Sequence, residues 1–85
     1  MHVDLEADLN TRDHTGLCWS FLDEAPDTGL VEAGALIIVG DDDAAAVAEV
    51  VEFETIETGT IVRFRLLPGS IEQYQALIDR LRLTA

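Results

Sequence analysis

The chain has 85 residues, no lysine, 48% hydrophobic residues and a net charge of −12. Its length allows one small domain, residues 1–85, and its apolar content excludes a wholly disordered chain. The charge argues against direct binding to nucleic acid or to an anionic membrane, because both require clusters of basic side chains.

Two runs near the N-terminal end predict strands. Residues 2–9 alternate polar and apolar side chains, which is the period of a half-buried strand with an acidic outer face. Residues 17–22 follow a polar loop and place Leu17, Trp19 and Phe21 on one face. We expect the two runs to pair as a hairpin, with these three side chains in the core.

The middle of the chain predicts two further strands. Residues 35–39 form a short apolar run between two glycines, which favours a buried strand. Residues 45–54 mix alanine, a helix former, with β-branched and aromatic residues, and we expect a strand. The apolar phase of this run slips by one residue, so a β-bulge is predicted near Val50 and Val51.

The alternation returns at residues 60–66, after a turn that contains Gly59. This turn is short enough to make a hairpin with the preceding strand. Pairing about the turn places Glu52 and Glu54 on the face that carries Arg63 and Arg65, so opposite charges are expected to meet across the strands.

Residues 71–82 predict an amphipathic helix. Ser70 is the expected N-cap, and Gln73 completes a capping box. Arg80 and Arg82 complement the helix dipole at the C-terminal end. The apolar stripe consists of Ile71, Tyr74, Leu77, Ile78 and Leu81.

These elements predict an α+β fold that is mostly β: a small five-stranded antiparallel sheet or partly open barrel with a C-terminal helix. A two-layer sheet with the helix on one side is the alternative if residues 44–54 are helical. The aromatic side chains are expected in the core. An incompletely closed sheet leaves edges to satisfy, so a homodimer is one option.

No phosphate-binding loop, dinucleotide fingerprint or nucleophile elbow is present, so we expect no enzymatic activity and no cofactor. Asp41, Asp42 and Asp43 have the oxygen ligands that hard cations prefer but lack the rest of a calcium loop. We expect a solvated turn there and no metal site. His14 and Cys18 lie four residues apart, without the paired spacing of a zinc site.

The distribution of charge carries the main functional information. Residues 1–57 hold fifteen acids against one arginine, whereas residues 58–85 hold two acids and four arginines. We expect a non-enzymatic interaction module that binds a basic protein partner or self-associates, since complementary charge speeds encounter and sharpens partner choice. The expected contact residues are Asp4, Glu6, Asp8, Asp23, Glu24, Asp27, Asp41, Asp42 and Asp43.

Other interpretations stay open. A small-ligand-binding or enzymatic barrel would have its site near Trp19, Cys18 and His14. An inhibitor that mimics nucleic acid would use the acidic face in place of phosphates. The acidity would have no binding role if it reflected a high genomic GC content or a saline cytoplasm.

Two segments between Gly34 and Tyr74 carry a resemblance: GALIIVGDDDAAAVAEVV and GTIVRFRLLPGSIEQY. They resemble the short acidic uncharacterised proteins of actinobacterial type, which implies a cytoplasmic bacterial setting and no known activity. A cytoplasmic location is also expected from the single cysteine, which excludes an intramolecular disulfide, and from an N-terminus without a basic region before an apolar run.

Overall fold

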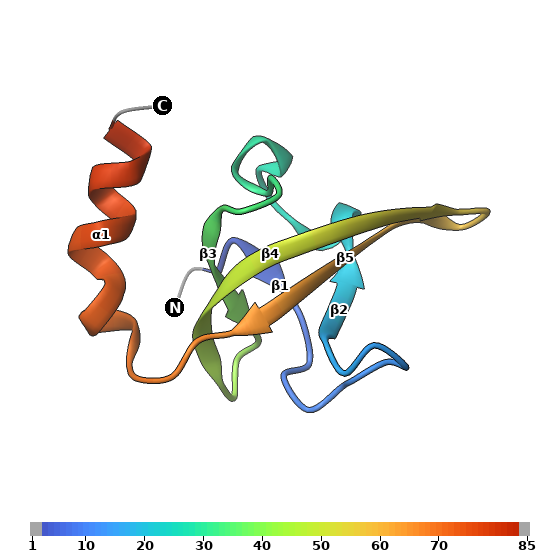
Figure 1. The fold of residues 1–85 in the computed structure, drawn as a ribbon, viewed down its shortest axis with the longest axis horizontal. Coiled ribbons are helices and arrows are strands. Elements are labelled where there is room, and N and C mark those ends of the chain that lie inside the picture. The colour runs from blue at the N-terminus through green and yellow to red at the C-terminus, as the bar shows by residue number, and fades with distance from the viewer. Residues whose placement is uncertain (1–2, 84–85) are drawn as a thin grey trace.

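The computed structural model describes residues 3–83, in which five strands precede one α-helix (Figure 1). In chain order the elements are β1 (Leu5–Glu6), β2 (Cys18–Phe21), the short 3-10 turns η1 (Leu22–Glu24) and η2 (Thr28–Leu30), β3 (Leu36–Gly40), β4 (Ala45–Ile56), β5 (Gly59–Leu66) and α1 (Ile71–Leu83). The predicted α+β, mostly β fold is confirmed, although the sheet is mixed and not antiparallel throughout. Residues 45–54 lie in the long strand β4, so the helical alternative for this segment is wrong.

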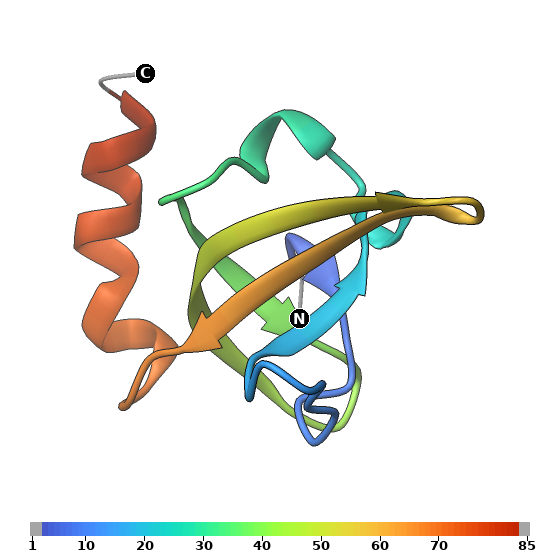
Figure 2. The ribbon, with the colours of Figure 1, turned by 45° about the vertical axis from the view of Figure 1, so that its right-hand side comes forward.

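The five strands form one mixed sheet in the order β1-β3-β4-β5-β2. β1 runs parallel to β3, with Leu5 opposite Val39, and the other neighbouring strands are antiparallel. The sheet curls into a half-barrel, which brings its two edge strands, β1 and β2, towards each other (Figure 2). α1 lies to one side of this half-barrel.

The predicted hairpin between the first two strands is wrong. β1 binds β3, because Asp4 N donates to Ile38 O at 2.8 Å and Ala7 N donates to Gly40 O at 2.9 Å. β2 instead pairs with β5 at the other edge of the sheet. The loop between β1 and β2 therefore crosses from one edge to the other, a non-local arrangement that local alternation does not reveal.

The first strand is also much shorter than residues 2–9. His2 lies outside the described residues, and ladder pairing covers only Leu5 and Glu6. Asp8 ends the extended region, since its Oδ1 accepts a hydrogen bond from Asn10 N at 2.9 Å and starts a turn.

The buried side chains come from both edges and from the middle of the sheet. The largest fully buried side chains are Leu5, Ile37, Val39, Val47, Val50, Val62, Phe64 and Ile78. Phe64 is the only aromatic side chain in this group, so the expectation of a core containing all the aromatics is wrong. Phe53 is 38% exposed near the outer end of the β4–β5 hairpin.

β2 faces the opposite way from the prediction. Its buried side chains are Cys18 and Ser20, whereas Trp19 and Phe21 are half-buried on the other face. The two rings pack against each other with centroids 5.6 Å apart in an edge-to-face arrangement. A one-residue change of phase exchanges the faces of a strand, and the small side chains of Cys18 and Ser20 fill the narrow space inside the curled sheet.

The predicted bulge is confirmed, because the β4–β5 register shifts between Val50 and Glu52. The charge pairing is confirmed for Arg63, which binds both Glu52 and Glu54. Arg65 pairs with Glu49 at 3.3 Å instead. The extra residue of the bulge offsets the two halves of β4, so Arg65 lies opposite Glu49.

The C-terminal helix agrees with the sequence to within one residue. Gln73 Oε1 accepts from Ser70 N at 2.7 Å, which is the half of the predicted capping box that the glutamine supplies. Gly69 has φ of +98°, and a side chain there would collide with the Gln73 amide. Of the apolar stripe, only Ile78 is fully buried.

Candidate functional site

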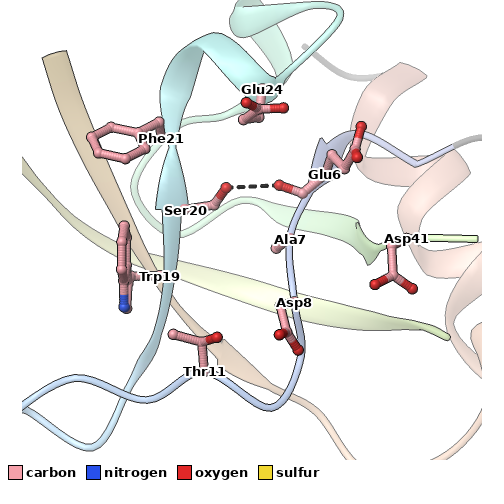
Figure 3. A pocket seen from close by; sticks show the side chains of 9 residues that line it. All are labelled: Glu6, Ala7, Asp8, Thr11, Trp19, Ser20, Phe21, Glu24 and Asp41. Carbon is pink, nitrogen blue, oxygen red and sulfur yellow. Dashed lines mark hydrogen bonds between the residues drawn. The ribbon is translucent and has the colours of Figure 1, made fainter. Parts of the chain in front are cut away.

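A groove of about 400 Å³ lies between the edge strands of the half-barrel, and we call it the acidic groove. Figure 3 shows the side chains that line it. Four of them are carboxylates: Glu6, Asp8, Glu24 and Asp41. The groove lies along the seam where β1 and β2 approach each other without forming a backbone ladder.

Ser20 bridges this seam. Its Oγ donates to Glu6 O at 2.7 Å, and among the described residues this is the one hydrogen bond between β1 and β2. Ser20 points towards β1, while the rings of Trp19 and Phe21 lie on the far side of β2 (Figure 3). A hydroxyl-to-carbonyl bond thus replaces strand pairing and covers part of both sheet edges.

The four carboxylates of the acidic groove come from three parts of the fold. Asp41 lies in the β3–β4 turn, where its Oδ1 accepts from Asp43 N at 2.9 Å and from Ala44 N at 3.1 Å. These bonds hold the Asp41 carboxylate in place. Glu6 belongs to β1, Asp8 follows it, and Glu24 ends η1. All four residues are exposed.

No arginine compensates this charge. None of the four carboxylates forms an ion pair within residues 3–83, and no basic residue lines the acidic groove. Arg12 donates to Leu9 O at 2.9 Å and to Cys18 Sγ, and it lines the smaller cavity that Cys18 borders. Like charges gathered in this way produce a negative potential that attracts cations.

Asp4 was expected on the outer acidic face, and this placement is wrong. Asp4 is 3% exposed. Its Oδ2 accepts from Ile38 N at 2.8 Å and from Arg82 Nη2 at 2.8 Å. Since a buried carboxylate requires hydrogen-bond partners, Asp4 is a structural residue that fastens the N-terminal segment to β3 and α1.

The remaining predicted contact residues are exposed and lie outside the lining of the groove. Asp42 and Asp43 share the β3–β4 turn with Asp41. Asp23 lies in η1, and Asp27 Oδ1 caps η2 by accepting from Gly29 N at 2.9 Å. The structure therefore gathers Glu6, Asp8, Glu24 and Asp41 from the predicted set and distributes these four elsewhere: Asp23, Asp27, Asp42 and Asp43.

The structure does not bring together Trp19, Cys18 and His14, on which the ligand-binding alternative depends. Cys18 is 2% exposed and borders a different, smaller cavity of about 150 Å³, on the opposite face of β2 from Trp19. Burial raises the pKa of the Cys18 thiol, although Arg12 acts in the opposite direction. His14 is exposed in the loop before β2.

A second group of charged residues surrounds Arg63, whose side chain is only 7% exposed. Its guanidinium contacts Asp13 at 2.6 Å, Glu54 at 2.6 Å and Glu52 at 3.3 Å. The hydrogen bond from Thr15, followed by that from Arg63, holds the pKa of the Asp13 carboxyl well below its usual range. The bonds from Asp13 and Glu54 raise the pKa of Arg63. Because every member is bound, this cluster stabilises the fold and is not a site for a ligand.

Sequence reasoning missed Asp13. Its signal was present in the Asp13-His14-Thr15-Gly16 turn, where Asp13 Oδ1 accepts from Thr15 N at 2.8 Å. Its pairing with a residue fifty positions away depends on β2 lying beside β5. Because the sequence led us to pair β2 with β1, it did not place Asp13 near Arg63.

Within the part of the chain that the structure describes, no group of three or more His, Cys, Asp or Glu side chains is placed to hold a metal ion. No helix between residues 3 and 83 is long and apolar enough to cross a membrane. No protein-family model, curated protein or solved structure matches the chain. Function must therefore be argued from the acidic groove itself.

Proposed function

We propose that the protein is a non-enzymatic interaction module whose acidic groove binds lysine and arginine side chains of a basic protein partner. The observation that carries this proposal is the convergence of Glu6, Asp8, Glu24 and Asp41 on one groove without a basic neighbour. Some other acids of this chain are paired internally, as Asp13 and Glu54 are with Arg63. These four are left for an external cation.

The flanking carboxylates extend the negative surface beyond the groove. Asp42 and Asp43 adjoin Asp41 in the β3–β4 turn, and Asp23 adjoins Glu24 in η1. Exposed charges of this kind raise the rate of encounter with a basic surface and discriminate against acidic ones. They contribute little affinity individually and are screened by salt, so binding is expected to be fast, moderate in strength and sensitive to ionic strength.

The groove is better suited to side chains than to an added β-strand. The Ser20 Oγ to Glu6 O bond of 2.7 Å already joins the two edges, whereas a strand inserted between them would need about 4.8 Å on each side. Basic side chains can enter the groove while this bond remains intact. We also propose a cytoplasmic location, which the free cysteine Cys18 supports.

The test compares two variants with the same change in net charge. In the groove variant, Glu6→Gln, Asp8→Asn, Glu24→Gln and Asp41→Asn remove the four groove charges and keep an oxygen acceptor at each position. In the control variant, Glu32→Gln, Glu57→Gln, Glu72→Gln and Asp79→Asn remove four exposed charges elsewhere. The probe is a short peptide of alternating arginine and serine, and binding is measured by isothermal titration calorimetry.

The groove variant is expected to bind the peptide about tenfold or more weakly than the wild type, because each charge pair contributes a few tenths to one kcal/mol. The control variant should lose less than about threefold, which is the effect of net charge at a distance. Equal losses in the two variants would show general attraction to an acidic protein and would contradict a specific groove.

A further inference from the structure

A second surface, distinct from the acidic groove, lies on α1. Leu77 is 44% exposed and Leu81 is 47% exposed, so the helix presents more apolar surface than the sheet covers. Leu81 and the buried Ile78 border a groove of about 240 Å³ between α1 and the chain that runs from η2 to the start of β3, which contributes Leu30 and Leu36. The exposed leucines and this groove form one apolar surface, which we call the α1 face.

The charge of the molecule is not spread over α1. The helix carries Glu72, Asp79, Arg80 and Arg82, which cancel, so the whole net charge of −12 belongs to the rest of the chain. Two copies that meet through α1 keep both helices between their acidic half-barrels. Because repulsion falls with distance and screening, the net charge opposes self-association less on this side than across the acidic groove.

The two sides of the α1 face carry opposite charges. Glu32 and Arg82 line the groove with Leu81, but Arg82 is already paired with Asp4, which leaves Glu32 as the uncompensated charge on this side. At 3.6 residues per turn, Arg80 lies beyond Leu77, on the side of the helix away from that groove. Neither Glu32 nor Arg80 forms an ion pair within residues 3–83. A twofold axis through the leucines places Arg80 of each copy near Glu32 of the other.

We propose that the α1 face is a homodimer interface, occupied by the α1 face of a second copy of this chain. The contact is isologous, with Leu77 and Leu81 at its centre and the two Arg80–Glu32 pairs at its rim. A basic partner has no excess of acid to recognise there, and an anionic membrane has no excess of base. This interface does not depend on the acidic groove.

The dimer is expected to be weak. A helix of 13 residues is about 20 Å long and about 10 Å wide. The area of the face that it presents is therefore much smaller than the roughly 800 Å² per partner of a standard stable interface. Salt is expected to strengthen the dimer, since it screens the repulsion between two bodies of charge −12. A contact made only of ion pairs would show the opposite dependence.

Sedimentation equilibrium of the full chain over a concentration series, at low salt and at about 0.5 M NaCl, tests the proposal. The double substitution Leu77→Ser with Leu81→Ser should weaken dimerisation by about tenfold or more. The matched control removes two other exposed apolar side chains at the far hairpin, Phe53→Ser with Ile56→Ser, and should leave it unchanged. Circular dichroism verifies that both variants are folded.

A charge exchange tests the register. Arg80→Glu alone should weaken the dimer by about fivefold, and adding Glu32→Arg should restore it, because the exchanged pair has the same attraction. A monomer at every concentration and salt, or dimerisation lost in the hairpin control and kept in the leucine variant, would overturn the proposal. A chain that stays monomeric would show that the α1 face does not bind a second copy.

Discussion

Arg82 Nη2 lies 2.8 Å from Asp4 Oδ2, and this ion pair joins residues 78 positions apart in the chain. The same carboxylate oxygen accepts the backbone N–H of Ile38 in β3. One buried acid therefore connects the segment before β1, strand β3 and the end of α1. Since α1 otherwise buries only Ile78 fully, this pair contributes much of its attachment.

Asp4→Ala is expected to destabilise the fold by about 3 kcal/mol, because it leaves Ile38 N without an acceptor and Arg82 without its partner. Arg82→Ala should cost about 1 kcal/mol, since the Arg82 side chain is 36% exposed. The control Arg80→Ala, on an exposed side chain of the same helix, should stay within about 0.5 kcal/mol. Urea unfolding measures all three, and equal effects of the two arginine variants would contradict the role of the pair.

The Arg63 cluster predicts a strong dependence on one guanidinium. Arg63→Leu leaves Asp13, Glu52 and Glu54 close together without a cation, and should lower the melting temperature by more than roughly 10 °C. Arg65→Leu is the matched control, because the Arg65 side chain is 60% exposed and contacts only Glu49. It should change the melting temperature by less than about 5 °C. Similar melting temperatures for the two variants would show that the Arg63 cluster stabilises the fold no more than the exposed Arg65–Glu49 pair does.

Asp13 makes a prediction about pH. Its pKa is lower in the folded protein than the ordinary value of 3.8, so its ionised form stabilises the fold above that value and this contribution is lost as the pH falls below it. Asp13→Asn should melt below the wild type at pH 7, and the difference should shrink as the pH falls below 3.8. Acidification also relieves the repulsion among the other acids, but it does so in both proteins, so the difference between their melting temperatures reports Asp13. A difference that stays constant down to pH 2 would contradict this assignment.

We expect the Ser20 hydroxyl to stabilise the contact between β1 and β2. Ser20→Ala removes the hydroxyl that donates to Glu6 O, which should cost about 1 kcal/mol and speed amide hydrogen exchange in β1. Ser70→Ala is the control, since the cap of α1 comes from Gln73. It should leave exchange in β1 unchanged. Unaltered exchange in Ser20→Ala would show that β3 alone holds β1.

The sequence predicted the elements governed by local periodicity. The bulge at Val50 and the helix from Ile71 follow from side-chain phase and from a cap a few residues away. The partners of β1 and β2 did not follow, because two neighbouring alternating runs favour a hairpin locally. Only the curled sheet shows that residues 7–17, between β1 and β2, cross from one edge of the sheet to the other.

The candidate site was predicted in the same uneven way. Glu6, Asp8, Glu24 and Asp41 could be named as acids, but their convergence depends on the seam between β1 and β2. Asp4 is also an acid and falls on the same side of the alternation as Glu6. It is nevertheless buried, because Ile38 N and Arg82 lie beside it only in the folded chain. Composition alone could not separate these two roles.

The most direct test of the central claim is a titration of the ¹⁵N-labelled protein with the peptide of alternating arginine and serine, followed by amide chemical shifts. We predict saturable shifts concentrated at the residues around Glu6, Asp8, Glu24 and Asp41, with small changes at Glu57 and Glu72. Shifts that never saturate, or that spread evenly over all exposed acids, would contradict a binding groove and leave only diffuse attraction to a negative protein.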